Sequence, residues 1–183
     1  MSTPETRPLE PYVTIYDTQI PDGIAERLSV IFERNYPKSH SDEEKAKDST
    51  ARRGKVAIQA LVEEGRTLHV AFTEDGEPAG FLEEQTIPVE DGVFEQLVWI
   101  IVGKRKIGLA SLLYQSFMRE ANKRAKDRQE PTRALLNVHK DNEEAKNIYL
   151  HWGWKPDTEN SPKDPNKLFM IMDLPKNDIR LSD

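Results

Sequence analysis

The sequence contains no cysteine among its 183 residues. This absence excludes disulfide bonds, thiolate metal ligands and a cysteine nucleophile. The longest apolar run, Leu97–Val102, is far shorter than the roughly 20 residues that a membrane-spanning helix needs. The first eleven residues also lack the apolar core of a secretion signal. We therefore expect a cytoplasmic protein with no membrane partner.

Histidine is scarce, and acidic residues exceed basic ones. The four histidines show neither HxH nor HExxH spacing, so we predict no metal site. Asp and Glu number 32 against 26 Lys and Arg, which gives a formal net charge of −6. This balance argues against broad nucleic-acid binding and is compatible with a cationic substrate.

The length and composition are typical of one globular domain that can bury a proper core. Residues 1–11 are polar and contain three prolines, so we predict a flexible N-terminal arm. Residues 12–174 are predicted to form a single domain, and residues 175–183 a C-terminal tail.

Hydrophobic periodicity predicts alternating strands and helices. The predicted strands are 12–16, 67–72, 79–87, 93–102 and 133–139, with a final hairpin from 153 to 172. The predicted helices begin with one that Asp22 caps and Pro37 ends, followed by a short one closing near Gly65, by Lys106–Asp127 and by Asn142–His151. Residues 38–54 are predicted to be a mobile loop, with a turn of helix at 42–47 as an alternative. This order indicates an α/β domain with a mixed, mostly antiparallel sheet. The continuous apolar end of strand 93–102 predicts a central position.

A basic, glycine-containing loop joins this strand to the long helix. The first amides of a helix lack intrahelical partners and attract anions. Gly108 permits close approach of a phosphate and Ala110 is nearly as small, while Lys104, Arg105 and Lys106 add positive charge. A Walker A loop is excluded, because its lysine and hydroxyl residue are absent after Gly108. From the loop alone, a phosphate cradle and a merely tight turn stay equally open.

A second group of polar residues follows about thirty residues later. Asn142 and Tyr149 are seven residues apart, so both project from one side of a helix, with the small Ala145 between them. The carboxamide of Asn142 is suited to bonding the peptide-like groups of a pantetheine arm. The phenol of Tyr149 is suited to protonating a leaving thiolate. Alternatively, Asn142 is only a helix cap and Tyr149 a half-buried core residue. Ile148 is predicted to be core.

Together the two motifs resemble those of the GNAT (general N-acetyltransferase) superfamily. The first is RxxGxA at residues 105–110, and the second is LxVxxxNxxAxxxYxxxGW at residues 136–154. The order of elements over residues 12–173 is similar to that fold as well. The chain departs from the usual pattern at Trp154, where phenylalanine is common, and at Val102, where proline often precedes the loop. Neither departure removes a functional group.

The resemblance implies a sheet of about seven strands flanked by about four helices. Its fourth and fifth strands, here 93–102 and 133–139, would be splayed to admit the pantetheine of acetyl-CoA. The resemblance then implies roles for individual residues. Ile100 and Val102 would bond the pantetheine, Asn142 would contact the cofactor arm, and Tyr149 would protonate the thiolate. The pyrophosphate would be held by the loop residues Arg105, Lys106, Ile107, Gly108, Leu109 and Ala110. An amide near Ile100 would stabilise the oxyanion.

An amine acceptor must lose a proton before it attacks. Glu95 is the first candidate for the base, and Glu83 and Glu84 are alternatives. Solvated surface acids are the competing interpretation of all three. The lack of cysteine favours direct transfer in a ternary complex.

We therefore expect an acetyl-CoA-dependent N-acetyltransferase that acts on a primary amine of a small molecule or a protein. A non-catalytic acyl-CoA-binding sensor is the alternative. By the resemblance, residues 36–55 and 155–167 would line the acceptor site. A polyamine, a drug, an amino acid and a protein N-terminus all stay open as acceptors. So do acetyl and longer acyl donors, and a monomer and a homodimer.

Overall fold

The computed structural model describes residues 10–36, 41–103, 108–128, 130–160 and 164–175. The chain divides into two compact units. The first comprises Met1–Glu83 and Trp99–Ser116, and the second comprises Glu84–Val98 and Phe117–Asp183. Two strands and one helix continue from one unit into the other.

The observed elements confirm an α/β fold with a mostly antiparallel sheet. Their order is β1 (Tyr12–Tyr16), α1 (Asp22–Asn35), α2 (Asp42–Thr50), α3 (Gly54–Glu63), β2 (Thr67–Phe72), β3 (Pro78–Val89), β4 (Gly92–Val102), α4 (Leu109–Asp127), β5 (Thr132–His139), α5 (Glu143–His151), β6 (Lys155–Pro156) and β7 (Lys167–Asp173). The strands follow the hydrogen-bonded order β1-β2-β3-β4-β5-β7-β6. The predicted central position of β4 is therefore confirmed.

None of the described helices is both long and apolar enough to cross a membrane.

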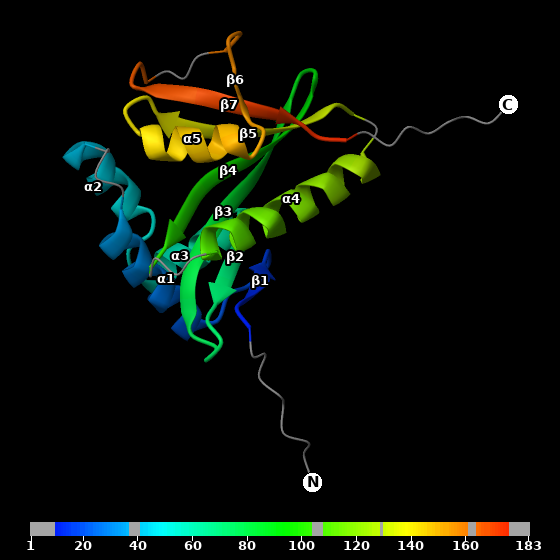
Figure 1. The fold of residues 1–183 in the computed structure, drawn as a ribbon. Coiled ribbons are helices and arrows are strands. Elements are labelled where there is room, and N and C mark those ends of the chain that lie inside the picture. The colour runs from blue at the N-terminus through cyan, green and yellow to red at the C-terminus, as the bar shows by residue number, and fades with distance from the viewer. Residues whose placement is uncertain (1–9, 37–40, 104–107, 129, 161–163, 176–183) are drawn as a thin grey trace, which may run out of the picture. The chain divides into compact units, whose positions relative to one another are not determined.

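In the first unit, α1 packs along α3 (Figure 1). The buried residues of α1 include Ala25, Leu28, Ile31 and Phe32, which recur at helical spacing and form one face. They join a core with apolar residues of α3, β2 and the end of β4, among them Ile101. β1 pairs antiparallel with β2, with Tyr12 opposite Phe72. This core fixes α1 and the end of β4 in one unit.

The region predicted as a mobile loop contains the helix α2, so the loop prediction is wrong for residues 42–50, and the alternative of a turn of helix at 42–47 is confirmed in part. The amide of Glu44 donates to Ser41 Oγ at 3.2 Å, and Glu44 Oε2 accepts from the Ser41 amide at 2.9 Å. This reciprocal pair is a capping box, which starts a helix even in a charge-rich segment. Asp22 also differs from its predicted role: it is the first residue of α1, and Pro21 occupies the cap position. Its charge still suits the first turn of a helix.

In the second unit, β4 pairs parallel with β5, from Val93 opposite Thr132 to Leu97 opposite Leu136. β7 lies antiparallel along the other edge of β5, and Figure 1 shows the two strands side by side. β4 starts at Gly92. This position requires glycine, because a Cβ here would collide with the carbonyl oxygen of Pro131. These pairings place the first five residues of β5 next to the first half of β4, while the end of β5 that leads into α5 lies beyond this pairing.

Candidate cofactor and acyl-transfer site

Two of the residues at the start of α4, Gly108 and Ala110, are exposed. Gly108, directly before the helix, has φ +103°, and no heavy atom lies within 4 Å of where its Cβ would be. Its carbonyl accepts a hydrogen bond from the Leu112 amide at 2.8 Å. Leu109 is buried, whereas Gly108 and Ala110 are exposed. The buried side chain of Leu109 thus fixes the start of the helix, and the residues on either side of it are exposed.

The helix begins at Leu109, three residues later than predicted. Three of the predicted cofactor residues, Arg105, Lys106 and Ile107, lie outside the described residues. Only Gly108, Leu109 and Ala110 of the predicted pyrophosphate loop can be placed.

The end of β4 belongs to the same unit as this helix start. Ile101 is buried, while Ile100 and Val102 are half-buried. Side chains alternate along a strand, so Ile100 and Val102 face away from Ile101. The amide of Gly103 donates to the carbonyl of Ala79 at 2.7 Å and ties the strand end to β3. Ile100 and Val102 therefore stand on a firmly held strand.

Asn142 caps α5, which was one of the two interpretations of this residue. Its Oδ1 accepts a hydrogen bond from the Ala145 amide at 3.1 Å, and the helix begins at Glu143. The side-chain nitrogen takes no part in the cap. The same carboxamide can thus close the helix through its oxygen and donate to a ligand through its nitrogen.

Tyr149 is the buried residue of α5, with 9% of its surface exposed. Its ring packs edge-on against Trp152 and Trp154, with centroid separations of 6.0 and 6.2 Å. The amide of Trp154 donates to the Tyr149 carbonyl at 3.0 Å. Trp152 and Trp154, which follow the helix, therefore hold the ring of Tyr149. Ile148, predicted as core, is 41% exposed, because the short helix buries only a narrow face.

Glu95 is completely buried and held by two arginines of the same unit. Arg124 donates to both carboxylate oxygens at 3.2 and 3.3 Å, and Arg128 donates to Oε1. Thr86 donates to Oε2 at 2.9 Å. A carboxylate with both oxygens engaged and no exposed surface is poorly placed to take a proton from a substrate amine. Glu95 as the base stays a prediction, and these contacts argue against it.

The two alternative acids are buried as well. Glu84 is paired with Arg124 in the second unit. In the first unit, Glu83 receives hydrogen-bonded contacts from Arg52 at 2.9 and 2.8 Å, and Arg66 lies 3.7 Å from it. The interpretation of all three as solvated surface acids is therefore wrong. They are buried ion-pair partners.

Sequence reasoning missed the cluster around Arg52. Its guanidinium carbon lies 5.2 Å from the ring centroid of Phe32 and 5.7 Å from that of Trp99. Tyr36 packs against Trp99 at 5.6 Å and donates its hydroxyl hydrogen to Asp48 at 2.7 Å. Burial, and then this hydrogen bond, raise the pKa of Tyr36, so its phenol stays protonated at neutral pH. The aromatic rings and the arginine stabilise the connection of α1 to the second half of β4.

Known proteins resemble this chain in structure. No protein-family profile and no curated protein matches its sequence. The structure resembles the PaiA N-acetyltransferase of Thermoplasma acidophilum in complex with coenzyme A, with a TM-score of 0.65 and 16% identity over 88% of this chain and 98% of that chain. It resembles an acetyltransferase of the GNAT family from Streptococcus pneumoniae, with a TM-score of 0.60 and 15% identity over 89% and 99% of the two chains. It also resembles the ribosomal-protein-S18-alanine N-acetyltransferase of Escherichia coli, with a TM-score of 0.54 and 21% identity over 89% and 93%. The chain has the GNAT fold.

Proposed function

We propose that this protein is an acetyl-CoA-dependent N-acetyltransferase that acylates a primary amine of a small molecule or a protein. The observation that carries the proposal is the exposed Gly108 at the start of α4, in a chain with the GNAT fold. The first amides of a helix are suited to a phosphorylated cofactor.

The cofactor would bind along two features of the first unit. The pyrophosphate would accept hydrogen bonds from the amides of Gly108, Leu109 and Ala110, together with those of the preceding residues 105–107. The pantetheine would bond backbone groups of Ile100 and Val102. The described pairing of β4 with β5 runs from Val93 to Leu97, so these two residues lie beyond it along β4.

Tyr149 would be the group that protonates the leaving thiolate. In the transfer, the neutral amine attacks the thioester carbonyl, and a tetrahedral intermediate forms. The carbon–sulfur bond then breaks, and the thiolate takes the phenolic proton of Tyr149. The attacking nitrogen loses one proton to water as the amide forms, and a proton from water restores the phenol. The Asn142 side-chain nitrogen would donate to the pantetheine arm. The buried state of Tyr149 between two tryptophans supports this role, because it limits the positions that its hydroxyl can adopt.

The first experiment is a screen of amines with acetyl-CoA, read by release of the free thiol of CoA. The protein has no cysteine, so every thiol detected comes from CoA. For an accepted amine, Tyr149→Phe should lower kcat by about 100-fold, the low end of what a general acid contributes. The KM for acetyl-CoA should change far less. Tyr12→Phe is the matched control, because Tyr12 of β1 stacks on Phe72 of β2 and belongs to neither motif.

A non-catalytic acyl-CoA-binding module is the second candidate. Burial of Glu83, Glu84 and Glu95 in ion pairs favours it, because each predicted base already has a partner. This candidate predicts binding of CoA without thiol release for any amine. If Tyr149→Phe instead turns over an accepted amine as fast as the wild type, the protein is an enzyme but Tyr149 is not its general acid.

A further inference from the structure

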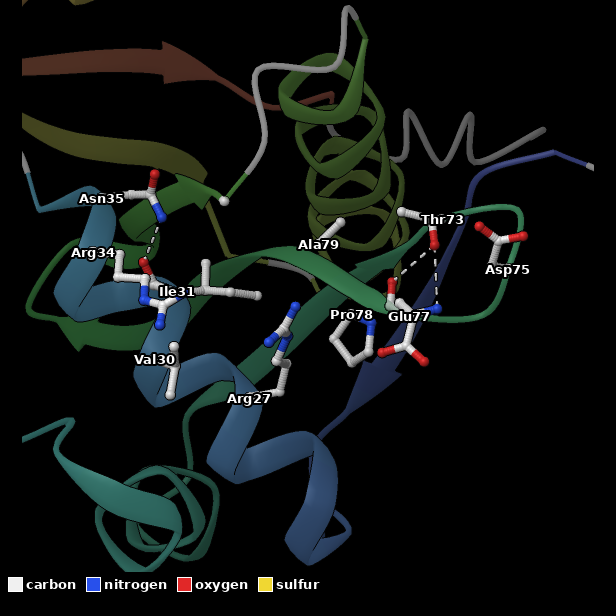
Figure 2. Close-up of a pocket in the computed structure, with 11 residues that line it drawn as sticks. Arg27, Val30, Ile31, Arg34, Asn35, Thr73, Asp75, Glu77, Pro78 and Ala79 are labelled. Atoms are coloured by element: carbon white, nitrogen blue, oxygen red, sulfur yellow. Dashed lines mark hydrogen bonds between the residues drawn. The ribbon is translucent and has the colours of Figure 1, made fainter.

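A cavity of about 200 Å³ lies in the first unit, between α1 and the turn that joins β2 to β3 (Figure 2). Its lining residues are Arg27, Val30, Ile31, Arg34, Asn35, Thr73, Asp75, Glu77, Pro78, Ala79 and Gly103. Pockets that hold drug-sized ligands measure roughly 300–1,000 Å³. This cavity therefore suits a smaller molecule, of the size of a free amino acid.

The two walls of the cavity carry opposite charges. Arg27 and Arg34 are seven residues apart on α1, so both lie on one face of that helix. Asp75 and Glu77 stand on the turn opposite. Figure 2 shows the guanidinium of Arg27 projecting from α1 toward the turn that carries Glu77. Across the described part of the chain, no ion pair within 4.0 Å involves any of these four residues. Groups of both signs thus border one cavity without neutralising one another.

The surface between the charged walls is apolar. Val30 and Ile31 line it from α1, and Pro78 and Ala79 line it from the start of β3. The amide of Asn35 is already engaged, because its nitrogen donates to the Ile31 carbonyl at 2.8 Å. A ligand that fits these surfaces has an anionic end, a cationic end and an apolar segment between them.

We propose that this cavity binds a small amphoteric molecule whose carboxylate and ammonium are separated by a short alkyl chain. The carboxylate pairs with Arg27 and Arg34, since guanidinium groups hold carboxylates in a bidentate manner. The ammonium pairs with Asp75 and Glu77. The alkyl chain covers the apolar surface and is removed from water.

This site is distinct from the proposed position of acyl transfer. The cavity is lined by Gly103, which directly follows β4. Gly103 is three residues beyond Ile100 and so roughly 10 Å away along an extended chain. An amine held there is too far from the Ile100 amide for direct attack on a carbonyl bound to it. The inference therefore stands independently of the proposed acetyl transfer.

The test uses the full-length, ¹⁵N-labelled protein and 6-aminohexanoate as the probe. Two amide signals report on the cavity: the backbone amide of Gly103 and the side-chain amide of Asn35. The indole signal of the buried Trp154, in the second unit, is the internal reference. Hexanoate and hexylamine, which each keep one of the two charges, are the matched probes. We expect saturable shifts at Gly103 and Asn35 with 6-aminohexanoate, and binding of either single-charge probe to be about tenfold weaker.

Variants assign the binding to the two charged walls. The double variants Arg27→Gln/Arg34→Gln and Asp75→Asn/Glu77→Gln should each weaken binding by about tenfold or more. Arg53→Gln/Arg119→Gln is the control, since these side chains are 78% and 69% exposed and lie outside the cavity lining. The proposal is overturned if hexanoate or hexylamine binds as tightly as 6-aminohexanoate, or if the shifts spare Gly103 and Asn35. It is also overturned if the cavity variants bind like the control. Thiol release from acetyl-CoA on the same preparations reports separately on the proposed enzyme activity.

Discussion

Replacing Glu95 by glutamine separates a structural role of this residue from a catalytic one. The substitution removes the negative charge but keeps a side chain of similar size. In the wild type, Glu95 faces two guanidinium groups and the hydroxyl of Thr86. Because glutamine is neutral, the positive charges of Arg124 and Arg128 lose one of the negative charges that balance them. If Glu95 serves the fold, the variant loses stability. If it is the base, the variant loses turnover.

The magnitude follows from the burial of the network. Breaking a buried ion pair on one side costs about 3–5 kcal/mol. The side chains of Arg124 and Arg128 are 29% and 27% exposed, and Glu84 still pairs with Arg124, so the loss is partly offset. Burial, and then the charge of Arg128, already lower the pKa of Arg124 to about 10. The charged form of Arg124 is therefore poorly solvated in the folded protein. We expect a loss of about 3 kcal/mol. For a chain of this length that corresponds to a fall of about 6–12 °C in Tm.

The assay combines urea unfolding with initial rates at a temperature where the variant remains folded. A structural Glu95 predicts the full loss of stability and a kcat within about threefold of wild type, whereas removing a general base lowers kcat by about 10²–10⁴. Glu120→Gln is the control, because the exposed Arg119 is the ion-pair partner of Glu120 in the described structure. This substitution should change stability by less than about 0.5 kcal/mol. A variant of Glu95 with wild-type stability and a hundredfold lower kcat would refute the reasoning.

Three further predictions concern the helix cap, the cofactor loop and the final hairpin. Asn142→Ala should lose about 1 kcal/mol of stability with the cap to the Ala145 amide, whereas Asn142→Asp should keep the cap and raise the KM for acetyl-CoA. Gly108→Ala should lose about 1–3 kcal/mol, because its φ of +103° strains any other residue, and should also weaken CoA binding in calorimetry. Burial raises the pKa of Asp157, but hydrogen bonds from Asn160 and Glu159 outweigh it and lower the pKa below 3.8. A lowered folded pKa stabilises the fold above the unfolded value. The stability difference between wild type and Asp157→Asn should therefore be constant above about pH 5 and shrink below about pH 4.

Each of these predictions has an opposing result. Equal loss of stability in Asn142→Ala and Asn142→Asp would contradict the cap. Gly108→Ala with wild-type affinity for CoA would remove this position from the cofactor loop. A stability difference for Asp157→Asn that stays constant down to pH 3 would contradict the lowered pKa.

Local patterns were sufficient to predict most elements, because their signals lie within a few residues. The apolar spacing of α1 and the continuous apolar end of β4 predicted a helix and a central strand. The same kind of signal was present for α2, where Ser41 and Glu44 have capping-box spacing. The density of charge in the same segment, however, favours a loop. At this position the capping box starts a helix in spite of the charge-rich composition.

The environments of the glutamates were beyond local prediction. Glu83 bonds Arg52, 31 residues away, and Glu95 bonds Arg124 and Arg128, 29 and 33 residues away. Without the fold, an acidic residue is expected at the surface. Its burial depends on an arginine that only the tertiary structure brings close. For the same reason, the unpaired charges around the cavity beside α1 follow from the structure and not from the sequence.

The central claim is that the segment between β4 and α4 binds coenzyme A, and direct calorimetric titration tests it most closely. Purified protein is titrated with CoA and with acetyl-CoA, alongside a variant in which Gly108 is replaced by valine. The account predicts saturable, one-site binding of both ligands to the wild type and binding at least tenfold weaker to the variant, because strain and a bulky side chain disturb the helix start. No measurable heat from either ligand with folded wild-type protein, or equal affinity in the variant, would contradict it.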